Sequence, residues 1–596
     1  MEETEKRSTL AHITEWAGGL LLFVATAAVV WWQNSRLTVL YDLCGVLENA
    51  VRIAQGDLPY KDFPFPYAPL TFLTQAAVIK LTGAIYWHHI VYCCVIAGLA
   101  TVILWRILAN LFREALPHSG LLAFLLSLPV TILGIYCVFP HPFYDPDATF
   151  VILVCILWAL RLEQKEFPPL RTFFLGVLCV APLFIKQNIG LAFLAGIGLC
   201  LLGALIFSVW TKLAVKPYLV LSGGITAGLL IATGIIHFTV GLEIYKQWTW
   251  DFATARRSPS AVDMLSVYAD HTLILWVGLV LSGAYLLRRN VDETSWRTIL
   301  GVLLIAVPFV WPVVYLMLDA DASERAERLV GLWPLGFIAS FALAYLFSRP
   351  LRGIALALPF ILIATSHGVF LSQQLWGSTY GIWPLLMILI ALILILLFDR
   401  DNKSSAAGVV TLACVISVAM IVAGSFYIYS NERLDYVSFD DGEMAHSTLP
   451  QLQGLSMRGS YIPDFEELVA YTDREIPRED GLLFLPGEDL FYYTTGRHPH
   501  FPVLLFDVTN NPYNADEIRE KVLSTDIDWI ILKNDLQIEA DQTINDKDRI
   551  FDVLKPYFRH IESLNNYEIY KRRRPDDPPD DEEDDDSDDS SESSEN

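Results

Sequence analysis

Long apolar runs separated by short polar stretches dominate residues 17–429 of this chain of 596 residues. A helix needs about 20 apolar residues to cross a bilayer, with a lower limit near 17. Fourteen runs approach or reach that length, so the pattern predicts a polytopic α-helical membrane protein. The runs cover residues 17–33, 67–83, 86–108, 120–138, 148–161, 170–185, 189–210, 218–240, 271–287, 297–318, 329–347, 353–371, 381–398 and 406–429.

Lysine and arginine gather at six junctions between these runs, and basic junctions favour the cytoplasmic side of a membrane. The six junctions fall on one side only if the run 67–83 does not cross; if it crosses, all six face outside. That run starts at a proline-rich turn and ends at Lys80 and Gly83. We therefore expect an interfacial helix over residues 67–83, within an outer loop of residues 34–85. This arrangement predicts about 13 transmembrane helices in residues 1–430 of a cell-membrane protein with a cytoplasmic N-terminus.

The periodicity changes after residue 430, where short buried strands alternate with amphipathic helices. Such alternation is typical of an α/β domain. We expect residues 431–574 to form a small extracytoplasmic α/β domain. Its predicted strands are Gly481–Pro486, Trp529–Leu532 and Asn566–Tyr570, and its predicted helices are Phe465–Arg474 and Asp516–Ser524.

Charge and cysteine usage change this picture only slightly. The formal net charge of −24 owes much to residues 575–596, an acidic stretch with serine and proline that we expect to be a disordered tail. It would solubilise the protein, as in a salt-loving organism, or dock to a partner. The eight cysteines lie mostly inside apolar runs and form no CxxC pair, so we expect no disulfide framework and no zinc site. The charged N-terminus predicts a retained anchor rather than a cleaved signal.

Acidic residues follow two of the predicted crossings on the outer side. Asp42 comes soon after the first run, and Asp145 and Asp147 lie in the sequence FPHPFYDPD after a later one. A carboxylate within hydrogen-bond reach of an acceptor hydroxyl can take its proton. The second acidic site would position the acceptor or hold a divalent cation through oxygen ligands. All three acids also fit the first turn of a helix, where carboxylates cap backbone N–H groups.

Basic residues are predicted on the same outer face. Such side chains bind phosphate, arginine through a planar fork and lysine as a point charge. Lysine at a helix end also reaches the interface with no ligand at all, and Arg325 has nearby acids with which to pair. The candidates for phosphate binding are Lys186, Arg256, Arg257, Arg325 and Arg328.

The outer loop carries a motif that resembles a known family. The stretch from Gly56 to Leu70 reads GDLPYKDFPFPYAPL, and its Tyr60, Asp62 and Tyr67 fit a G-x-x-P-Y-x-D-F…Y-x-P-L pattern. This pattern, with an acid after the first crossing and acids in the second outer loop, resembles the GT-C superfamily of integral-membrane glycosyltransferases. That group includes protein mannosyltransferases and aminoarabinose transferases. Residues 490–497, LFYYTTGR, resemble a strand of the family's outer C-terminal domain.

The resemblance implies an inverting transfer of a sugar from a polyprenyl-phosphate donor to a hydroxyl on a glycan, lipid or protein. Asp42 would be the general base, and the lipid phosphate would leave. The family often has a second acid directly after the first; here Leu43 follows Asp42, so Asp42 would work alone. Donors of this kind imply no cofactor, with a divalent cation as the open alternative. Membrane lipid is an expected partner and nucleic acid is not.

Three other classes of protein compete with this interpretation. A transporter or lipid-linked glycan flippase would place charges at mid-membrane on broken helices in repeated halves. An O-antigen ligase or polymerase would carry a large outer loop without the early acid. A membrane scaffold would carry a folded outer domain and no chemistry. Asp42 discriminates among them, because only the glycosyltransferase needs an acid at that place.

Overall fold

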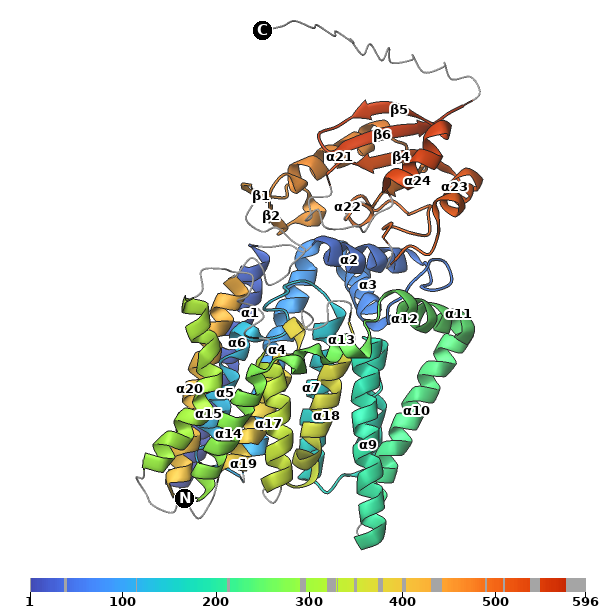
Figure 1. Cartoon of the computed structure of the whole chain (residues 1–596). Helices are drawn as coiled ribbons and strands as arrows, with labels where there is room; N and C mark the ends of the chain where they lie inside the picture. Colours follow the sequence, from blue (N-terminus) through green and yellow to red (C-terminus); the bar gives the residue numbers. More distant parts are fainter. Residues whose placement is uncertain are drawn as a thin grey trace, which may run out of the picture.

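The computed structural model describes residues 2–36, 40–113, 115–211, 215–289, 296–318, 329, 331–347, 351–372, 379–398, 403–429, 442–487, 490–507, 510–535 and 547–574. A bundle of helices forms one part of the molecule, and a smaller α/β domain lies at one end of the bundle (Figure 1). Helix α2 lies across that end, between the two parts. The acidic residues 575–596, the linker 430–441, Arg325 and Arg328 are outside the described residues.

The bundle helices match the apolar runs of the sequence. Seven helices in the described part of the chain contain a stretch long and apolar enough to cross a membrane, which makes this a membrane protein. They are α1 (Glu2–Asn34), α4 (Tyr86–Phe112), α9 (Gln187–Thr211), α10 (Lys216–Thr239), α15 (Trp296–Leu318), α18 (Gly353–Phe370) and α20 (Lys403–Tyr429). The other helices of the bundle are α5 (Ser119–Ser127), α6 (Val130–Leu133), α7 (Tyr144–Glu163), α8 (Pro169–Leu178), η1 (Ala181–Phe184), α14 (Thr272–Arg289), α17 (Leu332–Phe347) and α19 (Trp383–Leu397).

Every predicted apolar run is thus a helix or a pair of short helices in tandem. The predicted total of about 13 crossings stays a prediction, because seven helices meet the length criterion. Helix α1 begins at the end of the bundle away from the α/β domain (Figure 1). The start of α1 and the α/β domain therefore lie at opposite ends of the bundle, and which of them faces the cytoplasm also stays a prediction.

The end of the bundle beneath the α/β domain is more helical than the sequence indicated. Residues 34–85 contain α2 (Leu40–Gln55) and α3 (Leu70–Thr82), the second of which matches the predicted helix 67–83. The segment 241–270, which separates the apolar runs 218–240 and 271–287, is largely helical. It folds into α11 (Leu242–Lys246), the π-helix η2 (Gln247–Phe252), α12 (Ala253–Arg256), α13 (Ala261–Leu265) and η3 (Ser266–Ala269). A capping box at Ser260 and Asp263 starts α13, a local signal that the sequence analysis missed.

Glycines let α8 and α10 approach closely. A Cβ at Gly224 would lie 2.1 Å from the carbonyl oxygen of Phe173, and one at Gly176 would lie 2.4 Å from that of Leu221. Small residues at such crossings bring helix backbones together in membranes. The pair α8–α10 therefore packs tightly, while α10 presents most of its remaining surface away from the bundle.

The α/β domain is built on a four-stranded sheet of order β3-β4-β6-β5. Strands β3 and β4 are parallel, with Phe484 opposite Ile531, and the other pairs are antiparallel. A two-stranded ladder of β1 and β2 lies beside it. The elements are β1 (Met444–His446), η6 (Pro450–Leu452), β2 (Ser456–Arg458), α21 (Tyr461–Glu475), β3 (Gly481–Leu485), α22 (Phe491–Thr495), α23 (Ala515–Ser524), β4 (Ile527–Lys533), α24 (Lys547–Leu554), η7 (Lys555–Tyr557), β5 (Phe558–Ser563) and β6 (Tyr567–Arg572).

The predicted strands correspond to β3, β4 and β6, and the predicted helices to α21 and α23. The strand suggested for residues 490–497 is wrong. The helix α22 occupies Phe491–Thr495, and Gly496, with φ of 67°, ends it. All five residues are buried, so their hydrophobic pattern shows neither the period of a helix nor that of a strand, and the sequence does not tell the two apart here. The contact of α22 with α2 favours the helical turn, because the N–H of Tyr493 donates to Glu48 and not to a neighbouring strand.

Candidate active site

Helix α2 carries Asp42 in its first turn, at the end of the bundle that the α/β domain covers. Positions 42, 45, 46 and 49 follow helical spacing and line one side of a cavity. Leu43, Leu47 and Ala50 fall on another side of α2 and are fully buried. The amphipathic pattern thus fixes which side of α2 meets the core and leaves the Asp42 carboxylate half-buried beside the cavity.

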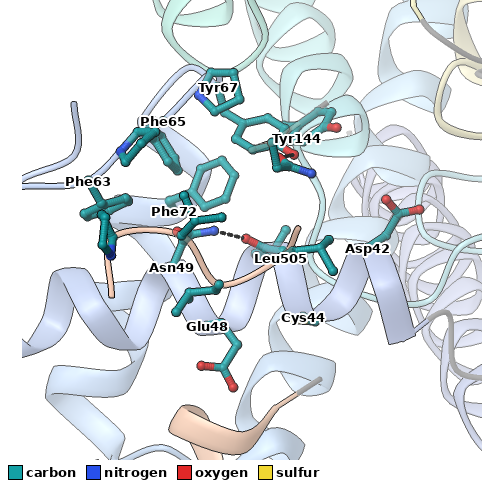
Figure 2. Close-up of a pocket in the computed structure, with 18 of the residues that line it drawn as sticks. Asp42, Cys44, Glu48, Asn49, Phe63, Phe65, Tyr67, Phe72, Tyr144 and Leu505 are labelled. Carbon is teal, nitrogen blue, oxygen red and sulfur yellow. Dashed lines mark hydrogen bonds between the residues drawn. The ribbon is translucent and has the colours of Figure 1, made fainter. Parts of the chain in front are cut away.

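The cavity has a volume of about 70 Å³ and is bounded by both parts of the molecule. Opposite α2 lie aromatic side chains of the outer loop and of α7, labelled in Figure 2 as Phe63, Phe65, Tyr67, Phe72 and Tyr144. The α/β domain contributes the segment 502–505 and Asn510. A cavity at the junction of two structural units, lined by apolar groups with a few polar ones, is typical of a ligand site.

Arg257 is the cation that lines the cavity together with Asp42. Its guanidinium lies 4.4 Å from the centre of the Tyr67 ring, within the range of a cation–π contact. Burial raises the pKa of the Tyr67 hydroxyl, and the nearby guanidinium opposes that rise. The Tyr67 hydroxyl donates to Asn510 Oδ1 at 2.9 Å and so ties the outer loop to the α/β domain.

Lys186 forms a buried ion pair with Asp145 beside the cavity. Its Nζ lies 2.5 Å from Oδ1 and 2.6 Å from Oδ2 of Asp145, and 4.8 Å from the centre of the Tyr144 ring. The Tyr380 hydroxyl donates to Asp145 Oδ2 at 3.2 Å. Burial lowers the pKa of the Lys186 ammonium, the Asp145 carboxylate opposes that shift, and the charges of Arg257 and Asp42 add effects of opposite sign, so these four groups lie near one another at the junction. An ammonium has three donors, and Asp145 occupies two of them.

Asp147 lies two residues from Asp145 and has a different environment. Its Oδ1 accepts from Tyr92 at 2.7 Å and from Tyr136 at 2.6 Å, and its Oδ2 accepts from Thr71 at 2.8 Å. Asp147 is not among the residues that line the cavity. These three hydroxyls join α3, α4 and the segment before α7 through Asp147, and the acceptor- or metal-positioning part predicted for it stays a prediction.

Another side of α2 connects to the α/β domain through buried charges. Glu48 points away from the aromatic side chains in Figure 2, and its Oε1 accepts from the N–H of Tyr493 at 3.0 Å. The Arg52 guanidinium donates to the carbonyl oxygen of Pro502 at 2.9 Å and to Asp57 Oδ2 at 2.5 Å. It also lies 4.3 Å from the centre of the Phe63 ring. Arg52 therefore joins α2, one wall of the cavity and the start of the segment 502–505.

The remaining predicted residues lie outside this cluster. The Tyr60 hydroxyl donates to the carbonyl oxygen of Tyr67 at 2.7 Å, and Asp62 accepts from the N–H of Leu58 at 2.7 Å, so both shape the loop that carries Tyr67. Arg256 is exposed and donates to the carbonyl oxygen of Asn511 at 2.8 Å. Arg325 and Arg328 are outside the described residues.

The sequence analysis missed several residues of this site. Tyr144, Tyr380 and the segment 502–505 gave no signal, because nothing in their local sequence shows that they meet Asp42. Glu48 and Arg52 had a weak signal: they are charged positions that helical spacing places near the apolar side of an amphipathic run. In the described part of the chain, no group of three or more histidine, cysteine or acidic side chains could hold a metal ion.

No protein-family model and no curated protein sequence matches this chain. Solved structures are similar to it at low identity. ArnT from Cupriavidus metallidurans bound to undecaprenyl phosphate covers 92% of this chain and 97% of its own, with 13% identity and a TM-score of 0.46. The apo state of ArnT covers 93% and 98%, with 14% identity and a TM-score of 0.43. The Archaeoglobus fulgidus oligosaccharyltransferase in complex with Zn and sulfate covers 86% and 68%, with 12% identity and a TM-score of 0.43.

At 12–14% identity and TM-scores below 0.5, the likeness is too low to transfer an activity, a ligand or a residue's role to this chain.

Proposed function

We propose that this protein is a membrane glycosyltransferase that moves a sugar from a polyprenyl-phosphate donor to a hydroxyl of a glycan, lipid or protein acceptor. One observation carries the proposal: a carboxylate, Asp42, and a cation, Arg257, line a cavity at the end of an apolar bundle, and a second cation, Lys186, lies 4.8 Å from the centre of the Tyr144 ring, which also lines it. The transfer needs a base that takes the proton of the acceptor hydroxyl and cations that bind the leaving phosphate. A lipid-anchored substrate accounts for their position at the end of the bundle.

The reaction is a single displacement. Asp42 takes the proton of the acceptor hydroxyl as its oxygen bonds to the anomeric carbon of the donor sugar. The bond from that carbon to the phosphate oxygen breaks, the configuration inverts, and both electrons of the bond leave with the lipid phosphate. Asp42 later returns the proton to solvent.

Arg257 and the third donor of Lys186 stabilise the negative charge that grows on the leaving phosphate. Asp145 holds Lys186 in place, so the ammonium needs little reorganisation during the reaction. The aromatic side chains of the cavity exclude water, which strengthens these charge interactions and protects the donor from hydrolysis. The cytoplasmic N-terminus and the extracytoplasmic α/β domain are part of the same proposal, because lipid-phosphate donors serve transfers on the outer face.

The test is sugar transfer by purified protein in lipid nanodiscs. Radiolabelled polyprenyl-phosphate hexoses and pentoses are the donors, and cell-envelope extract supplies the acceptor. Label should appear on an extract component with wild type and be lost with Asp42→Asn. The control is Asp251→Asn, which changes an exposed acid near Arg256 that pairs with Lys246 and should retain full transfer. Equal transfer by wild type and Asp42→Asn would remove Asp42 from the proposed role. Absence of transfer from every donor would contradict the proposal itself.

A further inference from the structure

A second cavity lies far from Asp42, in the other half of the bundle. It has a volume of about 200 Å³ and opens among α7, α8, α9, α10 and α18. Its walls are mainly apolar, and they include Cys200, Leu201 and Ala357. Helix α7 runs from Tyr144, which lines the first cavity, to Glu163, which lines the second. Along α7 the nearest residue of the second lining is Cys155, 11 positions after Tyr144, so the two linings are about 16 Å apart at 1.5 Å per residue.

Basic residues surround this second cavity where α7 ends and where α8, α10 and α18 begin. Each one is within two residues of a residue that lines the cavity. All five are exposed, and within the described residues none has an ion-pair partner. They are Arg161, Lys165, Arg171, Lys216 and Arg352.

Acidic residues at the same helix ends do not neutralise this charge. Glu163 and Glu166 are the carboxylates in this stretch of the chain. Glu163 Oε1 accepts from the N–H of Ile354 at 3.0 Å, so it serves the first turn of α18. Its position is tight, because a Cβ at Gly353 would lie 1.6 Å from that oxygen. The remaining positive charge lies at the rim of an apolar cavity.

We propose that this second cavity binds an anionic phospholipid, with an acyl chain in the cavity and the phosphate headgroup among the five cations. The apolar walls suit a hydrocarbon chain and no polar ligand. Basic residues at a bilayer surface attract anionic headgroups and discriminate little among zwitterionic ones. The site belongs to the leaflet opposite to the α/β domain and is independent of the proposed transfer reaction.

The ordinary alternative is that these cations only mark the side of the membrane. Arg113 separates the two explanations. It is also an exposed cation at a helix end, after α4, in the same region of the surface, since Asn110 accepts from Gln164 at 2.8 Å, yet no residue within two positions of Arg113 lines the cavity. A general surface attraction involves Arg113 as much as the others, whereas a built site does not.

The experiment uses the purified full chain in detergent, with dioleoyl phosphatidylglycerol, dioleoyl phosphatidylcholine or inorganic phosphate as the probe. Native mass spectrometry measures retained lipid. Wild type should retain phosphatidylglycerol in preference to phosphatidylcholine. The triple variant Lys165→Gln/Arg171→Gln/Arg352→Gln should bind it more weakly, by about fivefold per cation removed. Arg113→Gln should bind as wild type does.

Thiol labelling tests the acyl chain. Cys200 lines the cavity on α9, and Cys414 is a similarly half-buried thiol on α20 that does not line it. Phosphatidylglycerol should slow the reaction of Cys200 with N-ethylmaleimide and leave Cys414 unchanged, and inorganic phosphate should protect neither. Filling the cavity by Ala357→Phe should abolish both retention and protection. Ala357→Leu, a smaller filler, replaces it if the larger one fails gel filtration.

Four results would overturn the proposal: equal retention of the two lipids, equal losses in the triple variant and in Arg113→Gln, protection of Cys200 by inorganic phosphate alone, or full retention of phosphatidylglycerol in a folded cavity-filled variant.

Discussion

Asp145 and Asp147 are two residues apart and both buried, but their hydrogen-bond partners differ in charge. Asp145 bonds Lys186 in a cluster of ionised groups that includes Asp42 and Arg257. Asp147 bonds three hydroxyls, from Tyr92, Tyr136 and Thr71, and is not among the residues that line the cavity. Two positions in the first turn of one helix thus have different partners. The partners of a buried carboxylate, rather than the carboxylate itself, show whether it supports chemistry or packing.

The largest effect should come from breaking the ion pair between Lys186 and Asp145. Lys186→Met removes a cation that stabilises the leaving phosphate, so transfer should fall on the order of 100-fold. It also leaves Asp145 buried without its cation, which costs about 3–5 kcal/mol of unfolding free energy. Thermal denaturation and the transfer assay measure the two effects separately.

The double variant Lys186→Met/Asp145→Asn sharpens this result. Removing both charges should restore most of the stability and none of the transfer. Recovery of transfer in the double variant would show that the pair is structural, as the hydroxyl-bonded Asp147 is.

The next effect should come from Arg52, which connects α2 to the α/β domain. Arg52→Met removes the donors to Pro502 and Asp57 while α2 keeps its buried side. A small displacement of Asp42 should lower kcat on the order of tenfold, because proton transfer is sensitive to geometry. Arg52→Lys should restore little of the rate, since one ammonium does not reproduce the planar guanidinium that donates to Pro502 and Asp57 at once. Gln55→Ala, whose amide makes only 3.3 Å contacts to the same domain, is the matched control and should keep its rate.

For Asp147, which bonds three hydroxyls, we predict a loss of stability with little change in the rate of transfer. Asp147→Asn weakens charge-assisted bonds to three hydroxyls, which should cost about 1–3 kcal/mol. Transfer per folded molecule should stay near the wild-type value. Chemical denaturation and the transfer assay at equal folded concentration check both statements, and a large fall in kcat would place Asp147 with Asp42.

The smallest effect should come from metal removal. Arg257 and Lys186 supply the positive charge that a divalent cation would otherwise provide at the phosphate, so EDTA should leave transfer unchanged. Loss of activity in EDTA, with recovery on adding Mg²⁺ or Mn²⁺, would contradict the assignment of this positive charge to Arg257 and Lys186.

The bundle and the sheet could be predicted from the sequence because period and length are local properties. The apolar runs became helices, and Gly481–Pro486, Trp529–Leu532 and Asn566–Tyr570 became β3, β4 and β6. Asp42 could be predicted as a candidate because an acid after an apolar run is visible in the sequence. The distinct environments of Asp145 and Asp147 could not, since they depend on Tyr92, Thr71 and Tyr380, which come from distant segments. The segment 502–505 became part of the site only through the docking of the α/β domain on α2.

The most direct test compares Asp42→Asn with Asp147→Asn in one transfer assay, at equal concentrations of folded protein and saturating polyprenyl-phosphate sugar. The assignment of Asp42 as the general base predicts a fall in rate of about 10²- to 10⁴-fold for Asp42→Asn and a rate near wild type for Asp147→Asn. Full activity in Asp42→Asn, with the loss in Asp147→Asn instead, would contradict the account.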